Sequence, residues 1–343
     1  MPATPLPMRQ GKDARRDHQM RTRTRLLALA LAAPLVFAAC SGDDNNSQAQ
    51  QTNAGQATNM TIAVVTHGAA GDAFWDVVKN GAEAAGKQYG IKVNYNGNGD
   101  PAQQSQLIDA AVSQKVNGIV VSMANPDALK ESIEKAVQAG IPVITINSGQ
   151  DRSKEFGAIT HVGQSEDIAG QGAGEKMKEA GVTKLLCVVH EAGNVGLEQR
   201  CNGAKATLGG SVESLQVDGT NLADASSKIS AKLQSDKSID GVVTLGAQVA
   251  AVAETAIASA GSSAKLVTFD LNATVAKDIM SGKMLFAVDQ QPYLQGYLSV
   301  VMLTQYKANL NVLGGGQPVL TGPNLITKEN AAAVLPLAAG GTR

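Results

Sequence analysis

From Met60 onward, short runs of β-branched and other apolar residues alternate with longer stretches whose apolar positions recur at helical spacing. This alternation is typical of parallel strands joined by crossover helices. We predict strands over residues 61–66, 92–95, 118–122, 142–146, 184–189, 241–245, 265–269 and 284–288. We predict helices over residues 74–89, 101–114, 127–139, 165–180 and 221–234. Eight strand–helix units exceed what one doubly wound sheet usually carries, so we expect two α/β lobes.

The first forty residues have a different pattern. An apolar run ends in small residues before Cys40, and it begins directly after three arginines, Arg21, Arg23 and Arg25. About a dozen apolar residues are too few to span a bilayer comfortably, and the arginines argue against a buried helix. We therefore interpret residues 1–39 as a signal peptide.

The end of this segment resembles a bacterial lipoprotein signal, in which the cysteine is lipidated and becomes the first residue of the mature chain. By that resemblance Cys40 is a lipidation site. Phe37 stands where the motif usually has leucine, so ordinary cleavage stays an alternative, and translation could begin at Met1 or at Met20. Residues 40–59 are polar and contain little that can be buried, so we expect a flexible tether.

The charge and aromatic content argue against a polyanionic partner. The chain has 29 Lys and Arg against 30 Asp and Glu, and the predicted leader carries seven of the basic residues and two of the acidic ones. The remainder therefore has a net charge of about −6. Aromatic residues make up 3% of the chain, which is few for a protein that stacks bases. We expect no nucleic-acid partner.

Cysteine and histidine spacing indicates no metal site and no catalytic set. Three cysteines are too few for a disulfide scaffold, and no two histidines have metal-ligand spacing. The glycine-rich stretch 170–174 lies inside a predicted helix rather than between a strand and a helix, so we expect no dinucleotide and no other cofactor. Cys187 and Cys201 could form a disulfide in an oxidising compartment, or remain two buried thiols.

Polar residues stand at the carboxyl ends of the predicted strands, where α/β sheets bind their ligands. They are Thr66, His67, Asn147, Ser148, His190, Glu191, Gly246, Gln248, Asp270, Asn272, Asp289 and Gln290. Just beyond the first strand lie Asp72, Phe74 and Trp75. Two apolar ring faces amid amides and carboxylates suit a small, uncharged, hydroxyl-rich ligand. Alternatively, the two rings open a helix and pack into the core.

Several segments, in this order and spacing, resemble the periplasmic sugar-binding proteins of the ribose/galactose type, which are the type I solute-binding proteins of ABC transporters. They are residues 73–75, 78–82, 117–122, 139–143, 269–270 and 290–292. The resemblance implies two Rossmann-like lobes with parallel sheets, joined by three hinge crossings. By that likeness the N-terminal lobe comprises residues 60–162 and 291–320, and the C-terminal lobe comprises residues 163–290 and 321–343.

The resemblance also implies roles for the residues that match. Phe74 and Trp75 stand where the family sandwiches a sugar ring, and Asp72 where it has a hydroxyl-binding residue. The remaining first-rank candidates are Asn147, Arg200, Asp270 and Gln290, and the second rank comprises His67, His190, Glu191, Asn221 and Gln248.

Two departures from the ribose binders argue against inferring ribose. Asn147 and Ser148 replace an aspartate and an arginine, and the asparagine expected near Gly246 is missing. We expect Gly246 to leave room for something bulkier or differently oriented.

The function that follows is an extracytoplasmic substrate-binding protein of an ABC importer, which closes its hinge on a monosaccharide or polyol. Its partners would be the permease with its ATPase and, through Cys40, the membrane, and we expect a monomer without enzymatic activity. A sugar sensor for chemotaxis or signalling uses the same closure and stays an alternative. A sugar-processing enzyme is a weaker one, because the sequence offers no convincing acid, base or nucleophile set.

Overall fold

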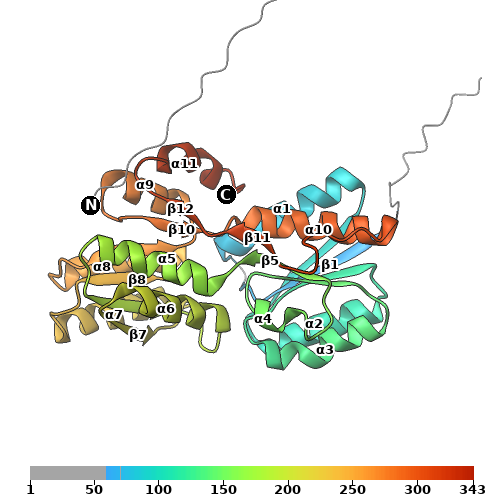
Figure 1. The fold of residues 1–343 in the computed structure, drawn as a ribbon, viewed down its shortest axis with the longest axis horizontal. Coiled ribbons are helices and arrows are strands. Elements are labelled where there is room, and N and C mark those ends of the chain that lie inside the picture. The colour runs from blue at the N-terminus through green and yellow to red at the C-terminus, as the bar shows by residue number, and fades with distance from the viewer. Residues whose placement is uncertain (1–58, 70) are drawn as a thin grey trace, which may run out of the picture. The chain divides into compact units, whose positions relative to one another are not determined.

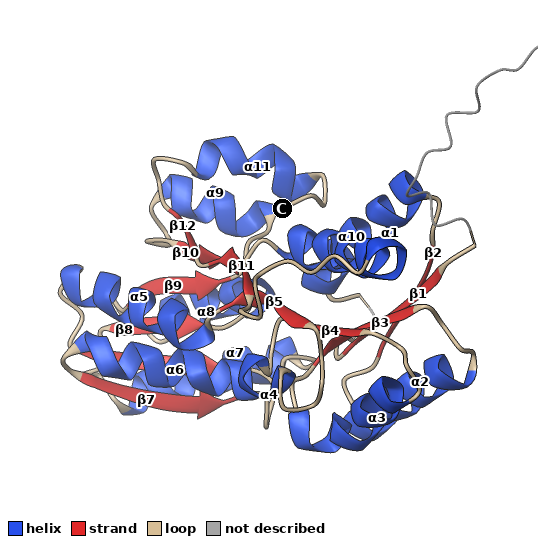
Figure 2. Ribbon diagram, turned by 45° about the vertical axis from the view of Figure 1, so that its right-hand side comes forward, coloured by secondary structure: helices blue, strands red, loops and turns tan. Residues whose placement is uncertain are grey.

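The structure is a computed structural model that describes residues 59–69 and 71–343 (Figure 1). The predicted signal peptide, Cys40 and all but the last residue of the predicted tether lie outside the described residues. The described chain folds into two lobes, each with a six-stranded sheet and helices on both of its faces (Figure 2).

The first sheet is entirely parallel. Its strands are β1 (Thr61–Thr66), β2 (Lys92–Gly97), β3 (Gly118–Ser122), β4 (Val143–Ile146), β5 (Thr160–Gln164) and β11 (Val319–Gly322). Its helices are α1 (Ala73–Tyr89), α2 (Pro101–Ser113), α3 (Pro126–Gln138), α4 (Gln150–Ser153) and α10 (Pro292–Asn309). The strand order is β11-β5-β4-β3-β1-β2. Strands β3 and β4 are buried along their whole length, as expected for central strands covered on both faces.

The second sheet repeats this arrangement, with one antiparallel pair at its edge. Its strands are β6 (Lys184–Val189), β7 (Ser211–Gln216), β8 (Gly241–Thr244), β9 (Lys265–Phe269), β10 (Ala287–Asp289) and β12 (Asn324–Ile326). Its helices are α5 (Glu166–Glu179), α6 (Val195–Leu208), α7 (Leu222–Ser235), α8 (Ala247–Ser259), α9 (Ala273–Ser281) and α11 (Ala331–Ala339). Because the order is β12-β10-β9-β8-β6-β7, β6 corresponds to β1 and β9 corresponds to β4.

The chain passes between the two sheets three times. It crosses after β5, again between β10 and α10, and a third time between β11 and β12. This confirms the predicted fold class of two α/β lobes with three crossings. The boundaries that we predict at residues 162 and 320 fall inside β5 and β11, and the position of each boundary stays a prediction.

Glycines allow helices α5 and α6 to pack closely. A Cβ atom on Gly170 would lie 2.2 Å from the Arg200 backbone oxygen, and one on Gly203 would lie 2.3 Å from the Asp167 oxygen. Real Cβ contacts of this length do not occur, so both positions require glycine. The glycine-rich stretch 170–174 therefore serves helix packing, and this packing places Arg200 beside the first turn of α5.

The predicted strands and helices are present, with small shifts at most ends. The largest shift is in the strand predicted over residues 284–288, which is found at Ala287–Asp289. Met284 and Phe286 are buried by packing against the core, and this burial gave them the pattern of a strand. Strands β5, β7, β11 and β12 were not predicted, because they are short or rich in polar residues.

Candidate functional site

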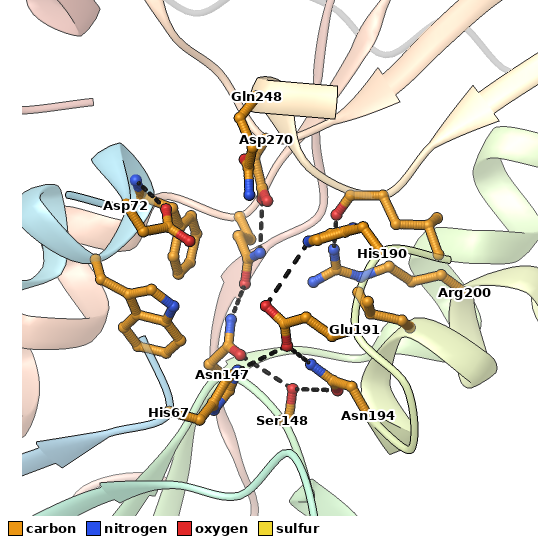
Figure 3. Close-up of a pocket in the computed structure, with 15 residues that line it drawn as sticks. His67, Asp72, Asn147, Ser148, His190, Glu191, Asn194, Arg200, Gln248 and Asp270 are labelled. Carbon is orange, nitrogen blue, oxygen red and sulfur yellow. Dashed lines mark hydrogen bonds and ion pairs between the residues drawn. The ribbon is translucent and has the colours of Figure 1, made fainter. Parts of the chain in front are cut away.

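A pocket lies at the carboxyl ends of the strands, where the two lobes face one another (Figure 3). The space among its lining atoms is about 340 Å³, part of which is open solvent. The lining residues are His67, Asp72, Phe74, Trp75, Asn147, Ser148, His190, Glu191, Asn194, Leu197, Arg200, Leu245, Gln248, Asp270 and Gln290. Most are polar, so the pocket can pair many hydrogen-bonding groups of a ligand.

The two lobes contribute side chains from corresponding positions. His67 follows β1 and His190 follows β6, whereas Asn147 follows β4 and Asp270 follows β9. The last two both adopt left-handed backbone angles, with φ of 63° for Asn147 and 67° for Asp270. Asn and Asp tolerate this region better than most residues, and such strain is common where a ligand is held.

The helix N-caps that face the pocket also correspond. Asp72 caps α1 by accepting a hydrogen bond from Phe74 N at 2.9 Å, and Asn194 caps α6 by accepting one from Gly196 N at 3.0 Å. Each lobe thus presents a capped helix start to the cleft. Asn194 was not among the candidates from the sequence, although its correspondence with Asp72 could have identified it.

A chain of hydrogen bonds runs from the first lobe through the hinge to the second lobe. Asn147 Nδ2 donates to Gln290 Oε1 at 3.0 Å, and Gln290 Nε2 donates to Asp270 Oδ1 at 2.7 Å. Gln295 Nε2 also donates to Gln290 Oε1, at 2.8 Å. Since both ends of the Gln290 amide are paired, its orientation is fixed, and it aligns Asn147 and Asp270 on the same pocket.

Arg200 is held by protein groups before any ligand enters. Its Nε and Nη2 donate to the two Glu166 carboxylate oxygens at 2.6 Å and 3.1 Å, and its Nη1 donates to Leu245 O at 2.9 Å. A guanidinium has five N–H donors, so two remain for other acceptors at the pocket. Glu166, buried at the start of α5, was not among the predicted residues, because its contact with Arg200 joins separate helices.

Glu191 lies between the two histidines. Its Oε2 is 3.7 Å from His67 Nε2, and its Oε1 is 3.7 Å from His190 Nε2. Burial lowers the pKa of both histidines, so we expect neutral imidazoles near pH 7. Burial by itself raises the pKa of Glu191, but the two histidines, a 2.6 Å hydrogen bond from Asn194 and Arg200 together lower it, which favours the carboxylate.

His190 has a free acceptor or donor in the pocket. Its buried Nδ1 has no hydrogen-bond partner among the described residues. Its ring occupies the space over Gly246, where a Cβ atom would be 2.9 Å from His190 Cε1 and 3.1 Å from Nε2. The expectation that Gly246 leaves room for a bulkier ligand is therefore wrong, because the imidazole fills this space.

The aromatic pair forms one corner of the pocket. The Phe74 and Trp75 rings are 5.0 Å apart at 86°, and the Trp75 ring also meets His67 edge-on at 4.7 Å. With this geometry a sugar ring does not fit between Phe74 and Trp75, so the two rings can contact a ligand only from one side. Trp75 belongs to the core of the first lobe as well, with 5% of its surface exposed. The pair therefore lines the pocket and also packs against the core of the first lobe, so each of the two interpretations from the sequence describes part of its environment.

Two carboxyl groups of the pocket have raised pKa values. Burial raises the pKa of Asp270 to about 7, against the opposing effects of Arg200 and of the hydrogen bond from Gln290. Burial raises the pKa of Asp72 to about 6, against its backbone hydrogen bond from Phe74. Near neutral pH each group can therefore accept a hydrogen bond as a carboxylate or donate one as an acid.

The structure brings all seven first-rank candidates to the pocket, together with four of the second rank. Asn221 is the exception: it caps α7, where its Oδ1 accepts a hydrogen bond from Asp224 N at 3.1 Å, and it does not line the pocket. Its polar character reflects its position as a helix cap. Besides Asn194, the sequence candidates did not include the apolar lining residues Leu197 and Leu245.

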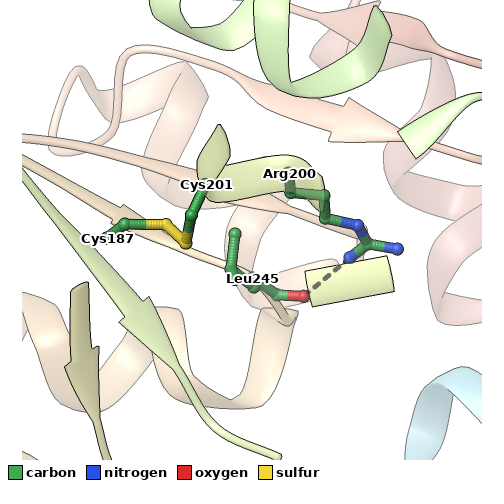
Figure 4. The surroundings of a disulfide bond; sticks show 4 residues. All are labelled: Cys187, Arg200, Cys201 and Leu245. Carbon is green, nitrogen blue, oxygen red and sulfur yellow. Dashed lines mark hydrogen bonds between the residues drawn. A yellow bond between two sulfur atoms is a disulfide. The ribbon is translucent and has the colours of Figure 1, made fainter. Parts of the chain in front are cut away.

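A disulfide bond joins Cys187 in β6 to Cys201 in α6, with an S–S distance of 2.02 Å (Figure 4). Cys201 directly follows Arg200, so the covalent link fixes the part of α6 that carries the guanidinium. In the described part of the chain, no group of three or more His, Cys, Asp or Glu side chains is arranged to hold a metal ion. None of the described helices has the length and apolar character needed to cross a bilayer.

Comparison with known proteins identifies related chains. Residues 62–310 match the family model described as a periplasmic binding protein domain. A xylose/arabinose-binding protein of Sulfolobus acidocaldarius is 24% identical over 71% of this chain and 67% of its own length. A ribose import binding protein of Bacillus subtilis is 24% identical over 73% of this chain and 83% of its own length.

Among solved structures, a carbohydrate transporter from Acidothermus cellulolyticus in complex with myo-inositol is 44% identical to this chain. The match has a TM-score of 0.82 and covers 83% of this chain and 99% of the other. A solute-binding protein from Burkholderia graminis, in complex with D-arabinose, has a TM-score of 0.73 and 24% identity, over 80% of this chain and 97% of the other. The second similarity concerns the fold alone.

Proposed function

The chain belongs to the family of periplasmic binding protein domains, and on that premise we propose that it is the extracytoplasmic substrate-binding protein of an ABC importer. Its ligand is an uncharged monosaccharide or polyol, held between the lobes. The observation that carries the proposal is the lining of the pocket, in which amides, carboxyls, imidazoles and a guanidinium from both lobes face one another. Such a set pairs hydroxyl groups, which both donate and accept hydrogen bonds.

Selectivity follows from the burial of these groups. Asn147, Arg200 and Asp270 are buried and keep donors or acceptors beyond those that their protein partners use, and a ligand lacking a matching hydroxyl leaves these unpaired. Each unpaired buried group costs roughly 1–3 kcal/mol, so the pocket discriminates among isomers of similar size. Anionic ligands are disfavoured, because three carboxyl groups, those of Asp72, Glu191 and Asp270, line the pocket and the charge of Arg200 is already paired with Glu166.

We take myo-inositol as the first candidate ligand. The supporting observation is the 44% identity to a transporter component that binds this molecule, over nearly the whole described chain. myo-Inositol is an uncharged ring with a hydroxyl on every carbon, and this chemistry fits the polar lining. Pentoses and hexoses are the alternatives, since curated relatives at about 24% identity bind such sugars.

Closure of the two lobes on the ligand explains how the importer would recognise the loaded protein. Hydrogen bonds already join the lobes around the pocket: Ser148 Oγ donates to Asn194 Oδ1 at 3.1 Å, and Gln199 Nε2 donates to Asp151 Oδ2 at 2.7 Å. A ligand that contacts both lobes adds to these bonds only when the cleft is shut, so binding shifts the hinge equilibrium towards closure. The permease with its ATPase would then bind the closed shape, and we expect no turnover of the ligand.

A thermal-shift panel tests this function. Inositols, pentoses and hexoses at millimolar concentration should include one neutral ligand that raises the melting temperature, since a ligand at a hundred times its Kd adds about 2.7 kcal/mol of stability. Inositol phosphates and uronic acids should have no effect. The shift should shrink in Gln248→Ala, which alters the pocket, and persist in Asn221→Ala, which does not. Shifts with the anionic ligands alone would contradict the proposal.

The export of the chain is a separate part of the proposal. Residues 1–39 would be removed as a signal peptide, and Cys40 would carry the lipid that holds the protein, as a monomer, at the outer face of the cytoplasmic membrane or in the periplasm. Mass spectrometry of the chain purified from its native membranes tests this. A first residue other than Cys40, or an unmodified Cys40, would exclude the lipid anchor and leave the ligand site unaffected.

A further inference from the structure

An apolar loop projects from the end of the first lobe that lies opposite the pocket. Helix α10 starts beside the hinge, and Leu303 lies against Gly118 at the first residue of β3, where a Cβ atom would be 3.0 Å from Leu303 Cδ1. The helix continues six residues further, to Asn309. At 1.5 Å per residue, Leu310 lies about 10 Å beyond Leu303 along the helix axis.

The loop that follows exposes three aliphatic side chains close together in the sequence. Leu310 is 75% exposed, Val312 is 60% exposed and Leu313 is 52% exposed. Leu310 also has a φ of 57°, at a helix end where glycine or asparagine is the usual residue. The turn itself therefore gives no reason for leucine, and more than half of the surface of each of the three residues is exposed.

The same end of the lobe is basic. Lys92 pairs in register with Thr61 at the start of β1, and Lys87 and Lys307 lie in the last turns of α1 and α10. Lys115 lies two residues before Asn117. Because Asn117 Oδ1 accepts a hydrogen bond from Thr61 N, this segment lies at the start of β1. All four lysines are exposed, and none belongs to an ion pair within the part of the chain that the structure describes.

The basic character is not offset by nearby acids in the sequence. Residues 84–99, 110–126 and 290–328, which contain the four lysines and the loop, include no aspartate or glutamate. The chain after the predicted leader has a net charge of about −6, and because these three ranges contain five lysines, the remainder has a net charge of about −11. The lysines at this end of the molecule therefore attract an anionic surface, against the overall negative charge of the chain.

We propose that this end of the first lobe, formed by Leu310–Leu313 and the four lysines, is a docking surface for an anionic phospholipid membrane. Aliphatic side chains beside lysines are the combination that binds peripheral proteins to such membranes. The chain also enters the lobe here, because β1 begins at Thr61. Cys40 lies 20 residues before Met60 in the sequence, so the lipid proposed on Cys40 would be attached on the side of the chain that enters the lobe here.

The docking surface lies at the opposite end of the strands from the pocket, so a membrane-docked protein keeps its cleft accessible. The pocket is at the carboxyl ends of the strands, and the docking surface is at their amino ends. Ligand binding and membrane docking can therefore be tested separately, and failure of one leaves the other unaffected.

Vesicle binding of the chain from residue 40 onward, with Cys40→Ser to exclude any lipid anchor, tests the proposal. All described residues belong to one compact unit that does not include the leader, so this chain can fold without it. At low ionic strength it should bind vesicles containing phosphatidylglycerol at least tenfold more tightly than pure phosphatidylcholine vesicles. Lys87→Gln, Lys115→Gln and Lys307→Gln should each weaken binding about fivefold, and Leu310→Ser with Leu313→Ser at least tenfold.

Matched controls lie on the second lobe. Ile168 is 55% exposed on α5 and Lys205 is exposed on α6, so Ile168→Ser and Lys205→Gln should leave vesicle binding unchanged. Equal binding to both kinds of vesicle, or equal losses in these controls, would overturn the proposal. A dimer that sedimentation velocity detects in the parent chain and not in the Leu310→Ser, Leu313→Ser variant would also overturn it, because a second copy would then cover the loop.

Discussion

Asp270 is a buried carboxyl whose ionisation couples stability to pH. Its pKa in the folded protein is about 7, raised from 3.8 by burial. A raised pKa means that the folded protein binds this proton more tightly than the unfolded chain does. Protonation of Asp270 therefore stabilises the folded protein relative to its ionised form, fully below pH 3.8, and this contribution to the free energy of unfolding is lost as the pH rises through 7. Asp270→Asn should therefore be more stable than the parent at pH 8, by up to about 4 kcal/mol, with little difference near pH 3.5.

Urea unfolding of both proteins between pH 3.5 and pH 9 measures this difference. The exposed Asp76→Asn serves as a control, and it should change the free energy of unfolding by about 0.5 kcal/mol or less across the range. A constant difference between Asp270→Asn and the parent would show that folding does not shift the pKa of Asp270.

Phe74 provides a cleaner test of the aromatic corner than Trp75. From the sequence one would expect Trp75→Ala to weaken binding and leave the fold intact. The structure argues otherwise, because Trp75 is part of the core and its truncation should cost roughly 3–5 kcal/mol. Phe74→Ala should weaken ligand binding about tenfold, a change of about 1.4 kcal/mol.

The fluorescence of Trp75, the only tryptophan of the chain, can follow this binding in both the parent and the variant. Equal dissociation constants for the parent and Phe74→Ala would show that the Phe74 ring does not contact the ligand.

The disulfide between β6 and α6 stabilises the folded protein by joining two neighbouring elements covalently. It closes a loop with a sequence separation of 14, and a loop of that size corresponds to about 3 kcal/mol of stabilisation. Reductant should therefore lower the free energy of unfolding of the parent by about that amount. It should have no effect on the double variant Cys187→Ala, Cys201→Ala, and a parent insensitive to reductant would contradict the bond.

Elements differ in how far the sequence predicts them. Strands such as β3 and β4 are continuous apolar runs, and they were predicted almost to the residue because both faces are buried. Strand β7 is an exposed edge strand with the sequence SVESLQ. It was not predicted, because its polar residues interrupt any apolar run. The Arg200–Glu166 pair depends on the close approach of α5 and α6, and no spacing within either helix indicates it.

For the whole molecule, the position of ligand sites at strand carboxyl ends is the main reason why the pocket could be predicted. The rule that ligands lie at strand carboxyl ends gave His67, His190, Asn147 and Asp270 without any template. The rule does not extend to contacts that form only when the lobes meet, such as Glu191 with His67. Those contacts depend on the hinge, whose geometry no local pattern contains.

The central claim is that the two lobes shut on one uncharged, polyhydroxylated molecule. Isothermal titration of the folded chain, first with myo-inositol and then with the pentoses and hexoses, tests it most directly. We expect saturable binding of one neutral ligand per chain, weakened at least tenfold by Asp270→Ala. Absence of binding by every neutral sugar and polyol at millimolar concentration, from protein that still unfolds cooperatively, would contradict it.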